Sequence, residues 1–350
     1  MKKAAEIESM GAGMDRADLS VMDMSKCETI TTPVSGQKDI GNRSFSVVSM
    51  FSGCGGMDLG FTGGFTIFGK KYHKQPFDIV WANDFNEAAV RTYRRNIADN
   101  IIGGDVWQLM ETMPKTADVV IGGFPCQDIS VNGKRKGVEG KRSGLYKAMV
   151  EAIGNLRPKI FVAENVKGLL MGDQSSLKQV LRDFRALGYS VTYDLYNAAD
   201  YGVPQTRDRV FIVGTLDSAR QFVKPAPILA KNQWMTAEEA IYDLEEMQEN
   251  GLSNHIWSRA NTSAEQGNRR LKADRPAYTI RAECHGNIQF HYKLPRRISM
   301  REAARFQTFP DNFVFDAMLR ETERQVGNAV PPVLAWHMAG AVARYLNENL

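Results

Sequence analysis

The chain lacks the cysteine patterns on which metal sites and disulfide frameworks depend. Its 350 residues include four widely separated cysteines and no CxxC pair; the four are Cys27, Cys54, Cys126 and Cys284. Closely spaced cysteine pairs are typical of zinc sites, and dense cysteine patterns are typical of small secreted domains. The sequence therefore predicts neither a bound metal nor a disulfide network, and a reducing cytoplasm fits best.

Long apolar runs are also missing. No apolar run approaches the roughly 18 residues that a membrane-spanning helix requires, and residues 1–10 contain two lysines but no apolar segment of the secretory kind. We therefore expect a cytoplasmic protein that does not act at a membrane. Hydrophobic residues still make up 43% of the chain, which is enough for a substantial core, and the length suits two domains.

The net charge of +4 is small, but the charges are unevenly distributed. Residues 251–310 contain 11 Lys or Arg against 4 Asp or Glu, and residues 134–147 contain 6 against 1. Residues 236–250 contain six acids and no base. Basic segments of this kind can contact a polyanion such as a nucleic acid, although on charge alone a solvated surface explains them equally well.

Short runs rich in Val and Ile alternate with helical patterns in the first two thirds of the chain. The runs predict buried strands at 45–50, 78–82, 118–123, 160–164 and 209–214. The helical patterns occupy 86–96, 145–156 and 177–187. The alternation predicts an α/β fold with a doubly wound, Rossmann-like parallel sheet, and ligands bind such sheets at the carboxyl ends of the strands.

The two ends of the chain and its third quarter do not show this alternation of strand and helix patterns. Residues 1–44 are polar and weakly periodic, so we expect an N-terminal tail to which no function is assigned. The alternation stops near Thr215, and the irregular, charged stretch that follows predicts a second, smaller domain. A capping box at 299–302 opens a further helix, and Pro331-Pro332 precedes an apolar helix that extends to Leu346.

The first predicted strand ends in a glycine-rich turn, FSGCGGMDLG, from Phe51 onward. Glycines such as Gly53 and Gly55 let a backbone approach a ligand closely. The dinucleotide fingerprint GxGxxG would need a further glycine where Asp58 stands, which argues against a pyrophosphate cofactor.

Acidic and aromatic residues follow the next strands. Asp84 could hold a ribose diol, Phe85 beside it could stack on a purine, and Asp105 could accept from an adenine amino group. Together they indicate an adenosine-bearing cofactor without a diphosphate. A solvated acid or an ordinary turn residue is the plainer explanation for each of them taken alone.

Cys126 is the sharpest candidate for a nucleophile. It follows the buried run 118–123 in the segment GGFPCQ and precedes a loop that contains Lys134, Arg135 and Lys136. Basic neighbours stabilise a thiolate, which is the nucleophilic form of the side chain. A lone cysteine is more often a small buried apolar residue, but the polar, basic loop favours exposure here.

Glu164 and two arginines complete the set of polar candidates. Glu164 ends a buried strand and is a candidate acid, with a helix cap as the alternative. Arg207 and Arg209 are two positions apart, a spacing that puts side chains on the same side of a strand. They could grip a phosphate and a carbonyl oxygen, and the alternative is a solvated strand edge.

Six sequence blocks in one order resemble those of bacterial DNA (cytosine-5) methyltransferases of the restriction–modification type, including orphan enzymes. The blocks are FSGCGG, GGFPCQDIS, AENVKGLL, YGVPQTRDRVFIVG, RRISMREAARFQTFP and QVGNAVPP. One block alone would carry little weight, whereas six in the family's unpermuted order are specific. The resemblance covers about residues 45–218 and 294–345.

The resemblance implies a mechanism. Cys126 matches the nucleophile that attacks C6 of a cytosine flipped out of duplex DNA, and Glu164 matches the acid that bonds ring N3. Arg209 matches the arginine that holds O2, and Arg207 matches its catalytic neighbour. The methyl group comes from S-adenosyl-L-methionine and is transferred to C5 through a covalent Cys–C6 intermediate.

The resemblance also implies binding residues. Those for the cofactor are Phe51, Gly53, Gly55, Asp84, Phe85, Asp105, Pro125, Leu145 and Asn328. Asp84 stands where the family usually has Glu, and Ala329 replaces a common serine. The expected DNA contacts are Gln127, Ser130, Asn132 and Lys134 in a catalytic loop, and Arg275 and Arg281 in the readout segment 274–282.

The same resemblance divides the chain by function. Residues 45–218, completed by 325–350, would form the catalytic and cofactor-binding domain, and residues 219–324 the target recognition domain. The expected partner is double-stranded DNA and the expected state is a monomer; a cognate restriction endonuclease is left open. Two alternatives stand beside this interpretation: a tRNA cytosine-5 methyltransferase, and a non-catalytic regulator that binds S-adenosyl-L-methionine and DNA.

Overall fold

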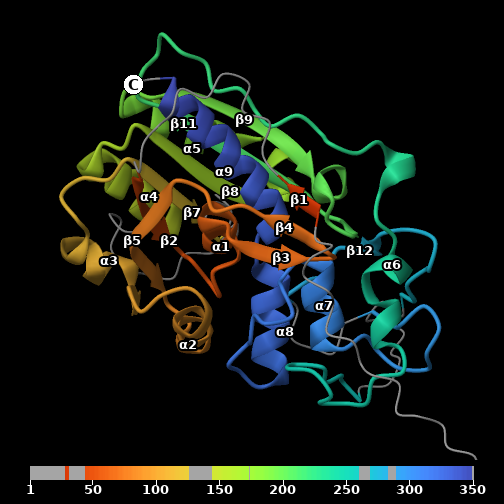
Figure 1. Cartoon of the computed structure of the whole chain (residues 1–350). Helices are drawn as coiled ribbons and strands as arrows, with labels where there is room; N and C mark the ends of the chain where they lie inside the picture. The colour runs from red at the N-terminus through yellow and green to blue at the C-terminus, as the bar shows by residue number, and fades with distance from the viewer. Residues whose placement is uncertain are drawn as a thin grey trace, which may run out of the picture.

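The computed structural model describes residues 28–30, 44–125, 144–172, 174–259, 269–282 and 289–348. Its centre is a seven-stranded sheet in the order β6-β5-β2-β7-β8-β11-β9 (Figure 1). In chain order the strands are β2 (Phe45–Met50), β5 (Phe77–Asp84), β6 (Ile101–Gly103), β7 (Val119–Gly123), β8 (Ile160–Val166), β9 (Ser190–Asn197) and β11 (Asp208–Thr215). The predicted α/β class is confirmed.

One strand departs from the predicted parallel arrangement. The pairs β6–β5, β5–β2, β2–β7 and β7–β8 are all parallel, but β11 runs antiparallel to both β8 and β9. The amino end of β11 therefore lies at the same edge of the sheet as the carboxyl ends of its parallel neighbours. This reversal decides which side chains can meet at that edge.

Alternate strand residues face two helical layers, as a strand's period of two requires. Val47 belongs to the core on one face, with α1 and α9, and Val48 to the core on the other, with α3, α4 and α5. The helices of these layers are α1 (Gly56–Thr62), α3 (Val106–Leu109), α4 (Leu145–Leu156), α5 (Ser175–Ala186) and α9 (Pro332–Asn347). Helix α2 (Glu87–Asn96) covers β5 and β6 in a smaller cluster.

Two small sheets accompany the large one. Strands β3 (Phe65–Ile67) and β4 (Lys70–Tyr72) pair antiparallel, and β1 (Glu28–Ile30) adds to β4 in parallel. The sequence predicts no strand in residues 1–44, so β1 is an addition to the expected tail. The other sheet pairs β10 (Gln205–Thr206) with β12 (Ala277–Tyr278).

The remaining helices pack around a third core. They are α6 (Ala237–Ile241), α7 (Met300–Phe306) and α8 (Leu319–Asn328), and in Figure 1 they lie together beyond one end of α9. Cys54 of the glycine-rich turn belongs to this same core. Within the ranges given above, no helix has the length and apolar character needed to cross a membrane.

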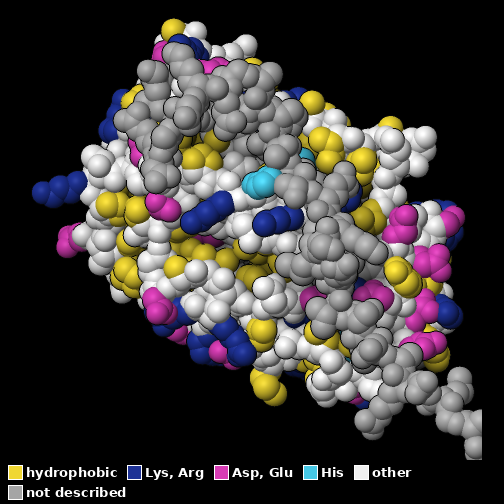
Figure 2. All heavy atoms as spheres, viewed as in Figure 1, with side chains coloured by type: hydrophobic (Ala, Val, Ile, Leu, Met, Phe, Trp, Pro, Cys, Tyr) yellow, Lys and Arg dark blue, Asp and Glu magenta, His cyan; other side chains and the backbone are white. Residues whose placement is uncertain are grey.

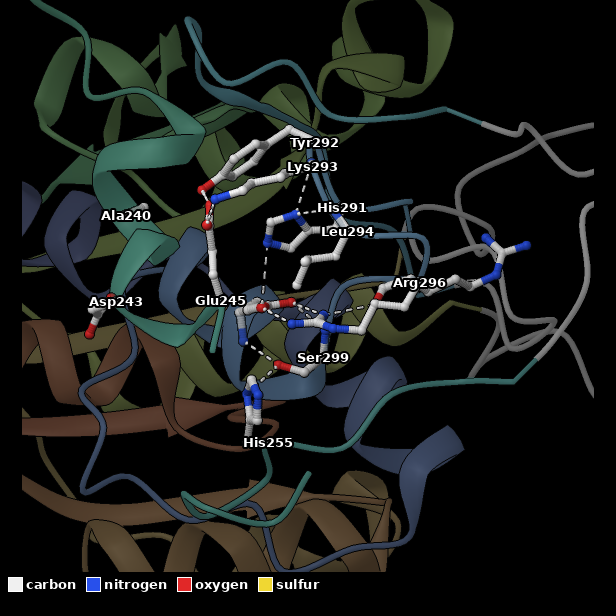
Figure 3. A network of polar contacts seen from close by, with 12 residues as sticks. Ala240, Asp243, Glu245, His255, His291, Tyr292, Lys293, Leu294, Arg296 and Ser299 are labelled. Carbon is white, nitrogen blue, oxygen red and sulfur yellow. Dashed lines mark hydrogen bonds and ion pairs between the residues drawn. The ribbon is translucent and has the colours of Figure 1, made fainter. Parts of the chain in front are cut away.

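A buried polar cluster fixes the start of α7 (Figure 3). The predicted capping box is present: Ser299 Oγ accepts from the Glu302 amide at 3.0 Å, and Glu302 Oε2 accepts from the Ser299 amide at 2.7 Å. Arg296 donates two bonds to the same carboxylate, at 2.7 and 2.8 Å. His255 Nδ1 lies 3.0 Å from Ser299 Oγ. The cluster thereby joins the segment around His255 to α7.

Helices α1 and α9 touch where glycine leaves no side chain between them. A Cβ atom on Gly60 would lie 2.3 Å from Ala335 Cβ and 2.6 Å from the Pro332 carbonyl oxygen. Such a contact cannot be relieved by rotating a flexible side chain, because one of the atoms belongs to the backbone. Close packing of the last helix on the first therefore depends on Gly60.

We predict that Gly60→Ala lowers the free energy of unfolding by about 1–3 kcal/mol, the usual cost of overpacking a core. Gly154→Ala is the matched control, because its Cβ would meet only Leu187 Cδ2 at 3.4 Å, and alanine is favoured over glycine inside a helix by up to about 1 kcal/mol. Urea unfolding of both variants measures the effect. Equal stability of the Gly60→Ala variant and the wild type would refute the packing argument.

Candidate active site

A cavity of about 390 Å³ opens at the carboxyl ends of the parallel strands. Residues from the ends of four strands line it. Phe51, Phe85 and Pro125 follow β2, β5 and β7, and Glu164 lies near the carboxyl end of β8. This is the edge at which the sequence places the ligand site. The volume falls within the usual range of small-molecule sites.

The glycine-rich turn forms one wall of the cavity. Phe51 has φ 55° and Gly53 has φ 57°, both in the left-handed region. The Gly53 amide donates to Asp84 Oδ2 at 2.8 Å, and the Asn86 amide donates to Asp84 Oδ1 at 2.8 Å. Asp84 therefore holds the turn against β5, and burial raises the pKa of its carboxyl group. A Cβ on Gly53 would meet no atom within 4 Å, so the space beside this backbone is open.

Phe85 presents its ring to solvent at the rim of the cavity. Its side chain is 78% exposed, which is unusual for a phenylalanine that borders a cavity. Leu145 at the start of α4 and Asn328 at the end of α8 also line the cavity. An exposed aromatic face beside apolar and amide groups suits a planar ligand that stacks on the ring.

Glu164 and Arg209 form a buried polar pair in the wall of the cavity. The antiparallel register pairs Phe211 with Glu164 and Arg209 with Val166, which brings the amino end of β11 beside the end of β8. Arg209 Nε lies 2.7 Å from Glu164 Oε1, and each residue is only 8% exposed. On the other side, a Cβ on Gly123 would lie 2.9 Å from Glu164 Oε2. Glycine on β7 therefore leaves the room that the carboxylate occupies.

The charge state of this pair is set by its burial. Burial raises the pKa of Glu164, while the guanidinium groups of Arg209 and Arg207 oppose the shift. The protonated form of the acid is therefore more accessible than for an exposed glutamate. A group in this state can donate a hydrogen bond as well as accept one.

Asn165 connects β8, which carries Glu164, to the segment that follows β7. Its Nδ2 donates to the Phe124 carbonyl oxygen at 3.0 Å, and its Oδ1 accepts from the Val166 amide at 2.9 Å. The side chain is 3% exposed. The end of β7, which leads to Pro125, is thereby fixed relative to Glu164.

Comparison with known proteins identifies the family. Residues 45–344 match the family model described as C-5 cytosine-specific DNA methylase. The chain is 36% identical over 338 residues to the Type II methyltransferase M.NgoFVII of Neisseria gonorrhoeae, with 87% of each protein covered. It is 32% identical to the Type II methyltransferase M.FnuDI of Fusobacterium nucleatum, covering 87% of the chain and 95% of the relative.

The chain belongs to the C-5 cytosine-specific DNA methylases. It is a DNA cytosine-5 methyltransferase of the type II family. Solved structures agree on the fold: one from an E. coli prophage, titled as a DNA modification methyltransferase, has a TM-score of 0.66 at 22% identity over 87% of the chain and 100% of that structure. The Dnmt2 methyltransferase of S. pombe has a TM-score of 0.66 at 18% identity, with 87% and 99% covered.

Most of the methylase's predicted cofactor residues meet at the cavity, but two do not line it. Those that do are Phe51, Gly53, Asp84, Phe85, Pro125, Leu145 and Asn328. Gly55 belongs to the same glycine-rich turn but packs against another part of the chain, since a Cβ atom there would lie 2.8 Å from Ile97 Cγ1. Asp105 caps α3 by accepting from the Trp107 amide at 3.0 Å. Local helix capping therefore accounts for Asp105 in the structure.

Arg207 has a different place from the one expected. It lies between β10 and β11, is fully buried, and is not among the residues that line the cavity. Its guanidinium donates to backbone carbonyl oxygens of Ile280, Gly327 and Ala329. The group is engaged by the protein's own backbone, and its part in gripping a ligand beside Arg209 stays a prediction.

Several predicted residues of the methylase lie outside the described residues. They are Cys126, Gln127, Ser130, Asn132 and Lys134, so their roles stay predictions. Arg275 and Arg281 are described and exposed, and neither lines the cavity. Arg275 Nε lies 3.2 Å from Asp274 Oδ1.

Gln325 and Asp58 also line the cavity, and neither was predicted to be a site residue. Gln325 on α8 is 5% exposed, and neither polar atom of its side chain has a partner among the described residues. Asp58 is fully buried; its Oδ1 accepts from the Tyr93 hydroxyl at 3.0 Å, and its Oδ2 has no partner among the residues described. Both stand in sequence blocks given above, FSGCGGMDLG for Asp58 and QVGNAVPP for Gln325. The sequence alone does not mark them as site residues, whereas their burial beside the cavity does.

The buried carboxyl of Asp58 makes the stability of the methylase depend on pH. Burial raises its pKa from 3.8 to about 6. Between these values the folded chain holds a proton that the unfolded chain has lost, so stability falls as the pH rises through this window. At a pH above both pKa values, the loss in the free energy of unfolding reaches about 3 kcal/mol.

We predict that Asp58→Asn removes this loss, because the amide does not ionise. Urea unfolding at pH 4 and pH 7.5 measures the change for each protein. The difference between the two pH values should be smaller in the variant by about 2–3 kcal/mol. Identical pH profiles for variant and wild type would contradict the assignment.

Proposed function

We propose that this methylase transfers a methyl group from S-adenosyl-L-methionine to C5 of a cytosine flipped out of double-stranded DNA. The observation that carries the proposal is a single cavity lined both by the buried pair of Glu164 and Arg209 and by the exposed Phe85. The pair suits the polar edge of a pyrimidine, and the ring suits a purine. Both groups open into the same space.

The cavity fits an adenosine-bearing methyl donor. The ring of Phe85 offers a stacking surface, and Asp84 beside it has oxygens with lone pairs left to accept from hydroxyl groups. Open space beside Gly53 admits a ligand close to the backbone. S-adenosyl-L-methionine bound here would supply the methyl group. Asn328, Leu145 and Pro125 line the remainder of the wall.

The chemistry follows from the needs of cytosine, whose C5 is a weak nucleophile. In the proposed reaction the Cys126 thiolate adds to C6, which makes C5 rich in electrons. Glu164 donates a proton to N3, and Arg209 stabilises the charge that develops at O2. C5 then takes the methyl group from S-adenosyl-L-methionine, which would leave as S-adenosyl-L-homocysteine. A base or a water molecule removes the C5 proton, the Cys126–C6 bond breaks to release the thiolate, and the N3 proton returns to Glu164. The raised pKa of Glu164 supports its part as a donor.

Exposed charge beside the predicted readout segment has both signs, because the Ala237 amide at the start of α6 donates to the Arg275 carbonyl oxygen at 2.8 Å. Figure 2 shows acidic side chains gathered over α6, and this agrees with the exposed residues Glu238, Glu239, Asp243 and Glu246. That surface would repel a polyanion. Arg275 and Arg281, in the predicted readout segment, belong to a different stretch of the recognition region and remain the proposed base or phosphate contacts.

We predict that the purified chain transfers labelled methyl from S-adenosyl-L-methionine to cytosine C5 of unmethylated duplex DNA. Bulk tRNA is tested in parallel, and Cys126→Ala should abolish transfer because it removes the nucleophile. Sequencing of the modified DNA gives the recognition site. Label in tRNA alone would show that the substrate is tRNA and not DNA, with the same chemistry. Cofactor and DNA binding with no transfer would favour the non-catalytic regulator.

We predict that Glu164→Gln lowers kcat by about 10²-fold or more, because the amide cannot pass a proton to N3. DNA affinity should change by less than about threefold, since the residue acts on charge that develops in the transition state. Glu323→Gln is the matched control: it is also a buried glutamate, 3% exposed, but does not line the cavity. Single-turnover kinetics and gel-shift titration measure both quantities. A pure binding defect would contradict the assigned role.

A further inference from the structure

Arg207 joins two segments that lie far apart in the sequence. Its Nη1 donates to the Ile280 carbonyl oxygen at 2.8 Å, and its Nη2 donates to those of Gly327 and Ala329 at 2.7 and 2.9 Å. The side chain is fully buried. Three carbonyl groups from two segments thus accept from one guanidinium, and that of Ala329 also accepts from a further side-chain donor, Gln307 Nε2, at 3.2 Å. Buried carbonyls left without a donor are costly.

Each of the two segments belongs to a different functional region. Gly327 and Ala329 line the cavity in which we place the methyl donor. Ile280 lies in the segment 274–282, which is the predicted readout segment for DNA. Arg207 therefore touches the wall of the cofactor site with one nitrogen and the recognition region with another.

The segments also touch each other directly. A Cβ on Gly327 would lie 2.4 Å from the Ala282 amide nitrogen and 2.4 Å from the Arg281 carbonyl carbon. Because glycine leaves backbone against backbone, no flexible side chain can absorb a displacement between the two. A movement of residues 280–282 must shift Gly327 or break the bonds to Arg207.

A second set of bonds ties the readout segment to β10, the short strand that precedes the strand carrying Arg209. Strand β12 pairs with β10, the Ile280 amide donates to Gln205 Oε1 at 2.8 Å, and Thr279 Oγ1 donates to the Thr206 carbonyl oxygen at 2.7 Å. Strand β10 leads through Arg207 directly into β11. Arg207 is thus the residue at which the recognition segment, the cofactor wall and the catalytic strand meet.

We propose that Arg207 is a positioning residue that couples engagement of DNA by residues 277–282 to the cofactor wall at Gly327–Ala329. This inference rests on the proposed function and extends it, since it assigns a route by which binding of one substrate changes the affinity for the other. Lysine cannot replace the arginine, because a single ammonium lacks the planar fork that reaches carbonyls in divergent directions. Coupling between two ligands is reciprocal, so the effect is measurable from either side.

The test measures binding of S-adenosyl-L-homocysteine with and without a duplex that contains the site mapped in the methyl-transfer experiment. In the wild type we expect the duplex to tighten binding by about fivefold or more, a typical coupling between two sites. In Arg207→Lys this factor should fall below about twofold, while each ligand alone still binds. The duplex affinity, measured with and without S-adenosyl-L-homocysteine, should change by the same factors.

Arg301→Lys is the matched control for a merely structural effect. Arg301 is also fully buried, and it donates to three backbone carbonyl oxygens, those of Ser253, Pro310 and Phe313, at 2.7–2.9 Å. None of these three residues lines the cavity. Arg301→Lys should lower the stability in urea to a similar extent as Arg207→Lys and leave the coupling factor unchanged.

A second measurement uses the wild type alone and decides the matter if Arg207→Lys does not fold. S-adenosyl-L-homocysteine should slow amide hydrogen exchange in residues 277–282, which do not line the cavity. No change there, or a coupling factor that survives in Arg207→Lys, would overturn the inference while methyl transfer by the wild type upholds the proposed function. Absence of transfer and of S-adenosyl-L-homocysteine binding in the wild type would instead refute the proposed function.

Discussion

The ion pair between Glu164 and Arg209 is the interaction around which the site is organised. Both side chains are nearly buried, and a buried ion pair is tolerated only where its geometry is good and its other polar atoms are satisfied. The antiparallel direction of β11 brings Arg209 to the end of β8, and the missing side chain of Gly123 leaves room for the carboxylate. Had β11 run parallel to its neighbours, Arg209 would lie at the opposite edge of the sheet.

Elements with strong apolar patterns could be predicted from the sequence, and those with mixed patterns could not. Strands β2, β7 and β8 are rich in apolar residues and almost wholly buried, because both of their faces are covered. Strand β9, Ser190–Asn197, is an edge strand whose Tyr193 and Leu195 are 40% and 41% exposed, so its pattern resembles a loop. The direction of β11 could not be deduced either, because direction depends on the connection from β9 and not on the residues of β11 itself.

The residues of the candidate site divide in the same way, into those that a local sequence pattern marks and those that it does not. Asp84 and Glu164 could be found because a polar residue directly after a buried run is conspicuous. The surroundings of Arg207 could not be predicted: its spacing from Arg209 suggested a shared strand face, but it precedes β11 and its side chain donates to backbone carbonyls. Those carbonyls belong to residues 280, 327 and 329, and no local pattern announces a contact over such a separation. The orphaned oxygen of Asp58 is likewise visible only in three dimensions.

The return of the last helix to the first has a consequence for how the chain is made. Helix α9 begins at Pro332, so the ribosome releases it long after α1 (Gly56–Thr62), and until then α1 lacks the α9 residues that pack against Gly60. The nascent chain must therefore hold an open apolar face through most of its synthesis, a state prone to aggregation. A product that stops before Pro332 never closes that face, and it would become a client of chaperones and proteases instead of a partly active enzyme.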